Sequence, residues 1–377
     1  MRTCCAETAS LNRDRCISSN PHWPDTFRFI RKKFSCGKDW RTWLALTRQR
    51  SPQSTSALPQ TDRPNGREPC LDERSITAIV VTYNRCALLM RCLSALANQT
   101  RKPARILVVD NASTDGTLEL LESAGWLARE DVRLLRLAHN TGGAGGFSAG
   151  LNHAIHHGAE WAWMMDDDAE PHNNALEELI RVIERPSDVY GSLAVNENET
   201  SWPMTLEGAP AHTTCLSADI PTKAEVRMLP FLGFLIHKDL VAKIGLPDAA
   251  FFIAADDVEY CVRAQRAGAK IFVAGKSHIE HPKSRPYQVK IPGYTLTSLE
   301  LPPWKRYYDT RNRLLVAREH YGLKLFTHTI PGSFVRMIAT LVREPGKLAQ
   351  LGAFFAGFID GVLGRKGCRH KSWGIKQ

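Results

Sequence analysis

Several common patterns are missing from this 377-residue sequence. No apolar run reaches 18 residues without a charge, so no membrane-spanning helix is expected. The first residues contain no apolar stretch of the kind found in a signal peptide, so no secretory signal is expected. The ten cysteines form no CxxC pair, which argues against zinc-knuckle and redox motifs. Reduced thiols in a cytoplasmic protein are therefore the expectation.

The composition is that of a folded protein with a basic surface. Apolar residues make up 43% of the chain and charged residues 23%, which excludes global disorder and collagen-like or coiled-coil repeats. The net charge is +10, and such a balance favours polyanions, namely nucleic acid, anionic lipid or phosphorylated substrates. No zinc-finger, helix-turn-helix or RNA-binding aromatic motif accompanies the charge, so no nucleic-acid partner is expected.

Residues 1–75 differ from the rest of the chain. They carry 14 Lys/Arg against 8 Asp/Glu, and the stretch 51–69 is rich in Ser, Pro, Gln and Thr, as linkers are. We expect a basic, disordered extension here. The segment 27–46 interleaves basic and aromatic residues, so a short amphipathic helix that binds a membrane surface or nucleic acid is the alternative.

We expect the folded part of the chain to begin at Ile76. Four short apolar runs without polar alternation predict buried parallel strands at 76–82, 105–110, 132–137 and 161–165. Helical spacing of apolar residues follows at 87–98, 117–123 and 147–157. Alternating strands and helices predict an α/β fold with a mostly parallel sheet, in which ligands bind beyond the carboxyl ends of the strands.

Three aspartates follow the last of these runs directly. Asp166 and Asp168 point to the same side of an extended chain, and adjacent carboxylates repel one another unless a cation is present. Oxygen ligands of this kind suit Mg²⁺ or Mn²⁺, which bridge diphosphates. The alternative is an acidic helix N-terminus before Pro171. Because the three aspartates follow a predicted strand directly, the metal site is favoured over the helix N-terminus.

Two further segments have the composition of a binding site. The glycines at 142, 143, 145 and 146 form an expected loop before a helix N-terminus, where anionic oxygens are readily held. Asp256, Asp257 and Glu259 form an acidic cluster at the expected start of another helix. Paired carboxylates raise one pKa, which suits a general base near neutral pH, although acids are also common at helix N-termini.

Four ordered segments resemble the signatures of family-2 inverting glycosyltransferases. They are Ile79-Val-Val-Thr-Tyr-Asn-Arg85, Val108-Val-Asp-Asn-Ala-Ser-Thr-Asp-Gly116, Asn140-Thr-Gly-Gly-Ala-Gly-Gly-Phe147 and Trp163-Met-Met-Asp-Asp-Asp168. The glycine segment and the aspartate triplet are most similar to the bacterial galactofuranosyltransferase and rhamnosyltransferase branch. The resemblance covers roughly residues 76–313. It implies a GT-A domain over 76–300 and a helical C-terminal region over 301–377.

The resemblance also implies roles for individual residues. Asp257 would be the general base, supported by Asp256 and Glu259. His281 would complete a Mn²⁺ or Mg²⁺ site with Asp166 and Asp168, with His278 as the competing ligand. The nucleotide sugar would be bound by Thr82, Asn84, Arg85, Asp110, Asn111, Gly142, Gly143, Trp163, Asp167, Arg263, Trp304 and Arg311. Asp110 would accept from a pyrimidine N3–H, which fits uracil or thymine and not cytosine.

The implied reaction is transfer from a UDP- or dTDP-sugar to a polyprenyl-linked or polysaccharide acceptor, with galactofuranose favoured over rhamnose. Phe354, Phe355, Phe358 and Ile359 could then lie in a lipid interface on the inner face of the membrane, although an ordinary packed helix pair explains them equally. A nucleotidyltransferase is the competing enzyme class. It would need a phosphate-gripping basic glycine loop after the first strand, where Tyr83-Asn84-Arg85 stands. The oligomeric state is left open.

Overall fold

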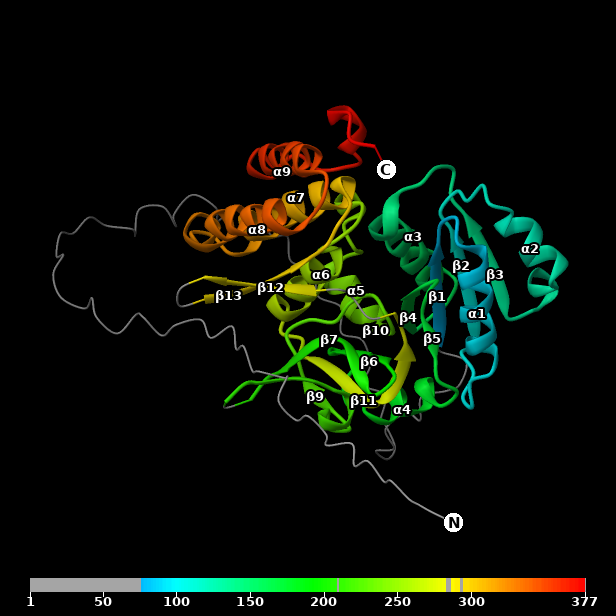
Figure 1. Ribbon diagram of the computed structural model, residues 1–377. Helices are drawn as coiled ribbons and strands as arrows, with labels where there is room; N and C mark the ends of the chain where they lie inside the picture. Colours follow the sequence, from blue (N-terminus) through cyan, green and yellow to red (C-terminus); the bar gives the residue numbers. More distant parts are fainter. Residues whose placement is uncertain (1–75, 209, 283–285, 292–293, 377) are drawn as a thin grey trace, which may run out of the picture. The chain divides into compact units, whose positions relative to one another are not determined.

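The computed structural model describes residues 76–208, 210–282, 286–291 and 294–376. The extension predicted for residues 1–75, and the amphipathic helix considered within it, lie outside the described residues. The described chain has a mixed α/β core and a helical C-terminal region, as the sequence predicts (Figure 1). The five cysteines within the described ranges are free thiols.

A large sheet organises the core. Its first half consists of β1 (Ile76–Thr82), β2 (Arg105–Asp110), β3 (Val132–Arg136) and β4 (Trp161–Asp166). These strands are mutually parallel in the order β3-β2-β1-β4. The four predicted strands are confirmed to within one residue at their ends. β1, β2 and β4 are almost wholly buried, as parallel strands covered by helices are, whereas the edge strand β3 is mostly half-buried or exposed.

The second half of the sheet was mostly not predicted. It contains β5 (Glu170–Pro171), β6 (Val189–Asn196), β7 (Glu199–Leu206), β8 (His212–Leu216), β9 (Ala224–Glu225), β10 (Phe234–His237) and β11 (Ile271–Glu280). The main order continues β4-β10-β6-β11-β5, with β10 antiparallel to both of its neighbours. In the sequence of this region the run 270–274 is strand-like, and β11 is twice as long as that run. A separate hairpin pairs β12 (Pro286–Ile291) with β13 (Tyr294–Leu299).

Helices follow the strands on both sides of the sheet. They are α1 (Cys86–Ala97), α2 (Thr117–Ser123), α3 (Gly142–His156), α4 (Ala175–Arg181), α5 (Lys238–Ile244) and α6 (Asp256–Arg266). Ile79 and Val81 of β1 share a cluster with Phe147 of α3, so α3 covers one face. Side chains alternate along a strand, so Ala78 and Val80, the neighbours of these residues, are buried on the other face.

The glycine segment corrects the prediction of a loop over 140–146. Helix α3 begins at Gly142, so most of these glycines lie in its first turns. A side chain at Gly146 would collide with Val81, and one at Gly150 with Ile79. Close helix-to-sheet packing is therefore one reason for the glycines. Gly142 is the exception, because its φ of +73° favours glycine and it begins the helix.

The C-terminal region is built from α7 (Pro303–His320), a π-helical turn (Leu325–Thr329), α8 (Ile330–Arg343) and α9 (Lys347–Val362). Figure 1 shows these three helices stacked beside one another. Glycines let α9 approach α7 closely, since a side chain at Gly357 would meet the backbone of Tyr307. Helix α7 carries Trp304 and Arg311, which were selected from the sequence, and its N-terminal turn reaches the site described next.

Candidate active site

A cavity of about 610 Å³ lies where the carboxyl ends of β1 and β4 meet the N-termini of α3 and α6. This volume is in the range of small-molecule sites in proteins. Thirteen of the predicted site residues line it, namely Thr82, Asn84, Arg85, Asn111, Gly142, Gly143, Asp166, Asp167, Asp168, Asp256, Asp257, His281 and Trp304. Segments that are far apart in the sequence therefore converge on one site, as parallel strands predict.

The aspartate triplet is crowded on one wall of this cavity. Burial, together with the carboxylates of Asp168 and Asp167, raises the pKa of Asp166 well above its ordinary value. Burial also raises the pKa of Asp167, against the hydrogen bond that Thr82 donates to it at 2.8 Å. Arg85 bridges Asp167 and Asp168 at 3.2 and 3.0 Å. A two-residue strand, β5, follows the triplet, so the alternative of a helix N-terminus at Pro171 does not apply.

His281 is the histidine that lies at the triplet. Its Nε2 is 4.0 Å from Asp168 Oδ1, whereas His278 contacts the carbonyl of Gly275 and does not line the cavity. The register of β11 shifts between Ala274 and His278, and this irregularity precedes both histidines. Burial lowers the pKa of His281, which keeps the imidazole neutral and able to bind a metal.

These residues fit a divalent cation. Five aspartates line the cavity, and two fixed cations, Arg85 and Lys305, are available to balance them. Burial is the main cause of the raised pKa of Asp166, and the carboxylates of Asp168, Asp167 and Asp256 add to it, so negative charge is concentrated at this wall. Carboxylates and a neutral imidazole are ligand types that suit Mn²⁺ or Mg²⁺, and of these residues Asp168 and His281 lie 4.0 Å apart.

The second acidic pair lies at the start of α6. Burial and the adjacent Asp257 carboxylate raise the pKa of Asp256, and burial raises the pKa of Asp257 to about 6. Asp257 Oδ1 accepts a hydrogen bond from the amide of Val258 at 2.7 Å, and the guanidinium of Arg313 partly offsets the shift. A carboxylate of this kind is ionised at neutral pH and is a stronger base than an ordinary aspartate.

A strained loop presents this pair. Phe252, Ala254 and Ala255 all have φ between +59° and +69°, which is rare for residues with side chains. The Phe252 carbonyl accepts a hydrogen bond from Ala144 at 3.1 Å, and a side chain at Gly142 would collide with it. The glycine turn and the loop before α6 are therefore in direct backbone contact.

Helix α7 holds the same loop from the other side. The Asn312 amide donates to the carbonyls of Phe251, Ile253 and Ala254 at 3.0, 2.8 and 2.7 Å. The Arg311 guanidinium donates to Phe251 at 2.8 Å and also to Gly367. Both side chains are fully buried, so they brace the loop and do not contact the cavity.

Five of the predicted residues do not line the cavity. Asp110 is 1% exposed, accepts from the Ser113 amide and lies 3.3 Å from Arg136 Nε. Glu259 and Arg263 form an ion pair at 2.8 Å. Trp163 is buried within β4, and Arg311 bonds the loop as described above.

The sequence analysis missed Lys305. It lines the cavity beside Trp304, and burial together with the nearby Arg85 lowers its pKa. The segment Trp304-Lys305-Arg306 was the available signal, but only the aromatic residue was selected. Phe252 and Ile253 also form part of the wall, through the backbone conformation of the strained loop.

A second group of ligand-type atoms lies outside the cavity. It consists of Glu259, Glu319 and His320, whose atoms lie within 4.8 Å of one another. Glu259 is already paired with Arg263 and lies 3.0 Å from His320, and Glu319 is paired with Lys366. These groups compensate one another, so we assign no metal to them.

Sequence comparison identifies a matching family and several relatives. The sequence profile "Glycosyl transferase family 2" matches residues 77–245. Galactofuranosyltransferase GlfT1 of Mycobacterium tuberculosis (strain H37Rv) is 30% identical over 249 residues, which are 63% of this chain and 81% of that protein. The dTDP-rhamnosyl transferase RfbF of Shigella flexneri is 22% identical over 300 residues, which are 78% of this chain and 97% of that protein.

Solved structures share the fold. GalNAc-T7, solved with UDP, GalNAc and Mn²⁺, superposes with a TM-score of 0.53 at 14% identity, over 81% of this chain and 59% of that chain. Residues 1–349 of S. aureus TarS give a TM-score of 0.51 at 18% identity, over 76% of this chain and 81% of that chain. At this identity the likeness concerns the fold alone, and it confirms the predicted GT-A fold.

Proposed function

Since the chain belongs to glycosyltransferase family 2, we propose that it transfers galactofuranose, with inversion, from UDP-galactofuranose to a lipid-linked or cell-envelope glycan. One observation carries the proposal: the aspartate triplet with His281 and the Asp256–Asp257 pair line the same cavity on different segments. An inverting displacement needs a leaving-group site and a base on opposite faces of the anomeric carbon, and two separate acidic groups supply both.

A divalent cation belongs to the leaving-group side. Asp166, Asp168 and His281 would hold Mn²⁺ or Mg²⁺, which neutralises charge that develops on the diphosphate. Arg85 and Lys305 are placed to contact the phosphate oxygens, because both line the cavity beside the triplet. Fixed cations of this kind stabilise charge in the transition state without reorganisation.

The nucleoside would lie toward β1, β2 and the start of α3. Thr82, Asn84, Asn111, Gly142 and Gly143 line this end of the cavity. Asp110 remains the proposed reader of the base N3–H, because its Oδ2 accepts no hydrogen bond among the described residues. The base could reach Oδ2 only if the half-exposed Arg136 moved away from it.

Asp257 performs the proton transfer in this proposal. Its carboxylate removes the proton from the acceptor hydroxyl, and that oxygen attacks the anomeric carbon. The bond from this carbon to the diphosphate breaks, and the nucleoside diphosphate leaves. Asp256, with its higher pKa, retains its proton at neutral pH and can donate a hydrogen bond to the acceptor. Trp304 offers an aromatic face to a sugar ring.

A rhamnosyltransferase that uses dTDP-rhamnose is the second candidate. The match to the Shigella flexneri dTDP-rhamnosyl transferase over 97% of that protein favours it. Both candidates share the fold, the proposed metal site and the proposed base. They differ in the nucleotide and the sugar.

The test is a panel of nucleotide sugars with the purified full chain and Mn²⁺. With UDP-galactofuranose we expect the donor to stabilise the protein thermally and to be hydrolysed slowly, with release of UDP. The Asp168→Asn variant should show neither effect with the same donor. Turnover of dTDP-rhamnose alone would replace the first candidate by the second. Release of pyrophosphate from a nucleoside triphosphate and a sugar phosphate would refute both and support a nucleotidyltransferase.

A further inference from the structure

Helix α8 exposes a continuous row of apolar side chains. Phe334, Ile338 and Val342 are four residues apart, and Phe326 in the preceding π-helical turn extends the row. Ile338 and Val342 are 62% and 74% exposed, and Phe326 is 65% exposed. Residues spaced by four lie on one face of a helix, so these side chains form a single stripe.

Helix α9 exposes a second stripe, and Phe334 of the first stripe packs against this helix. Phe334 contacts Phe354 and Phe358 of α9, with ring centroids 5.3 and 5.2 Å apart. The hairpin surface is defined as Phe326, Phe334, Ile338 and Val342 together with Leu348, Phe355, Ile359 and Val362, all of which are exposed. Phe354, considered above for a lipid interface, is instead buried, whereas Phe355 and Ile359 are exposed.

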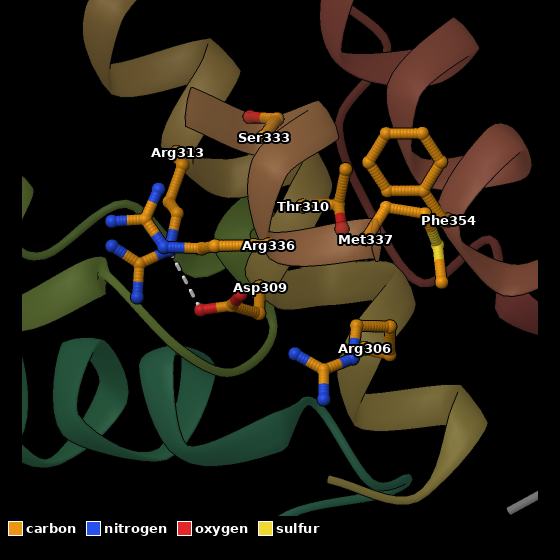
Figure 2. Close-up of a pocket in the computed structure, with 8 residues that line it drawn as sticks. All are labelled: Arg306, Asp309, Thr310, Arg313, Ser333, Arg336, Met337 and Phe354. Carbon is orange, nitrogen blue, oxygen red and sulfur yellow. Dashed lines mark hydrogen bonds and ion pairs between the residues drawn. The ribbon is translucent and has the colours of Figure 1, made fainter. Parts of the chain in front are cut away.

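The opposite face of α8 is anchored to the protein. Figure 2 shows Ser333 and Met337 of α8 facing Thr310 of α7 and Phe354 of α9 around a small cavity. The stretch Leu325–Arg343 is long and apolar enough to cross a membrane by length and composition, which the sequence analysis did not expect. Its anchored face and the arginine at position 336, within the cavity lining, favour a helix that lies on a surface.

The charges around the hairpin surface have one sign. From Tyr321 to Lys376 the chain contains nine Lys/Arg and two acidic residues, Glu344 and Asp360. Both acids are buried, at 3% and 0% exposure, and are paired with arginines. The exposed charged side chains next to the apolar stripes are Lys324, Arg343 and Lys347.

We propose that the hairpin surface docks this protein on an anionic lipid bilayer. Apolar side chains would enter the interface between headgroups and acyl chains, and the flanking cations would contact the lipid phosphates. The same helix α7 that supports the hairpin carries Trp304 and Lys305 at the cavity, so docking fixes the site relative to the membrane. The inference does not depend on which sugar is transferred.

Vesicle sedimentation of the full chain tests the inference. We expect binding to vesicles of phosphatidylcholine mixed with phosphatidylglycerol, weaker binding to phosphatidylcholine alone, and weaker binding in high salt. The Ile338→Glu/Val342→Glu double variant should lose binding by about tenfold or more, because two exposed side chains can no longer enter the interface. Lys347→Ala should cost about fivefold, and only with the anionic vesicles.

The matched control replaces two exposed apolar residues elsewhere, Leu216→Glu and Met228→Glu, at 45% and 44% exposure. The controls should bind as the unaltered protein does, and all variants should keep its melting temperature. Equal loss of binding in the controls, or undiminished binding of the double variant, would overturn the inference. A dimer in light scattering that becomes a monomer in the double variant would show that a second copy covers this face.

Discussion

Replacing Asp257 by asparagine is expected to lower the catalytic rate and raise the stability of the protein at the same time. General-base catalysis contributes about 10²–10⁴ in rate, so kcat should fall by that factor. Donor affinity should stay within a few-fold, because the asparagine Oδ1 can still accept from the Val258 amide and the nucleotide lies elsewhere.

The gain in stability follows from the raised pKa. Folding shifts the pKa of Asp257 from 3.8 to about 6, so its charged form is disfavoured in the folded state. Two pH units correspond to about 3 kcal/mol, and solvent access and the coupling to Asp256 reduce this to about 1 kcal/mol. Below pH 3.8 Asp257 is protonated in both the folded and the unfolded protein, so it does not lower the stability. From there to about pH 6 the unfolded chain releases its proton first, so the folded protein loses stability as pH rises.

Chemical denaturation in the presence of chelator at pH 4 and pH 7.5 measures this effect. The variant should be more stable than the unaltered protein at pH 7.5, and the difference should shrink toward pH 4. Asp131→Asn is the matched control. The ion pair with Arg129 lowers the pKa of Asp131, so removing this carboxylate should not stabilise the protein. A variant that keeps more than one tenth of kcat, or that is less stable at pH 7.5, would refute the reasoning.

Three other outcomes are expected. Asn312→Ala should lower the free energy of unfolding by about 2–4 kcal/mol, since it removes the side-chain donor to the Ile253 and Ala254 carbonyls, whereas the Phe251 carbonyl keeps Arg311; Asn312→Asp, which supplies no donor, should not restore the stability in urea titrations. His281→Ala should weaken Mn²⁺ binding by at least about tenfold in calorimetry, whereas His278→Ala should not, and equal effects would contradict the assignment. UDP and dTDP should bind more tightly than CDP, and Asp110→Asn should reduce that preference; equal binding of CDP to the unaltered protein would contradict the role of Asp110.

The first half of the fold was predictable because three of its strands, β1, β2 and β4, are almost wholly buried. Runs such as 76–82 and 105–110 contain almost no polar residue, and such runs are read directly from a sequence. Strands β7, β8 and β11 mix polar and apolar residues, β10 is only four residues long, and two of the pairings contain bulges, so the local sequence pattern is weak. Their positions depend on contacts with segments far away in the chain.

The positions of the acidic groups were also predictable from the sequence. The residues that hold these groups in place were not. Asp166 and Asp257 stand out because carboxylates directly follow apolar segments. The choice between His278 and His281 required the structure, because it depends on the irregular course of β11. Nothing local indicates that Asn312 would bond three carbonyls of a loop some sixty residues earlier. The helical start at Gly142 was missed because glycine disfavours helices by propensity, and only packing on β1 explains it.

The brace on the strained loop has a consequence for synthesis on the ribosome. The large sheet is complete once residue 280 has been made, but the loop before α6 is held by Arg311, Asn312 and the backbone of Gly367. Gly367 belongs to a C-terminal segment that is held by the buried carboxylate of Asp360. This carboxylate accepts hydrogen bonds from Arg369 and Trp373. A nascent or prematurely terminated chain would therefore contain the whole sheet without a fixed acidic pair. We expect an affinity tag at the C-terminus to disturb this segment more than one at the N-terminus.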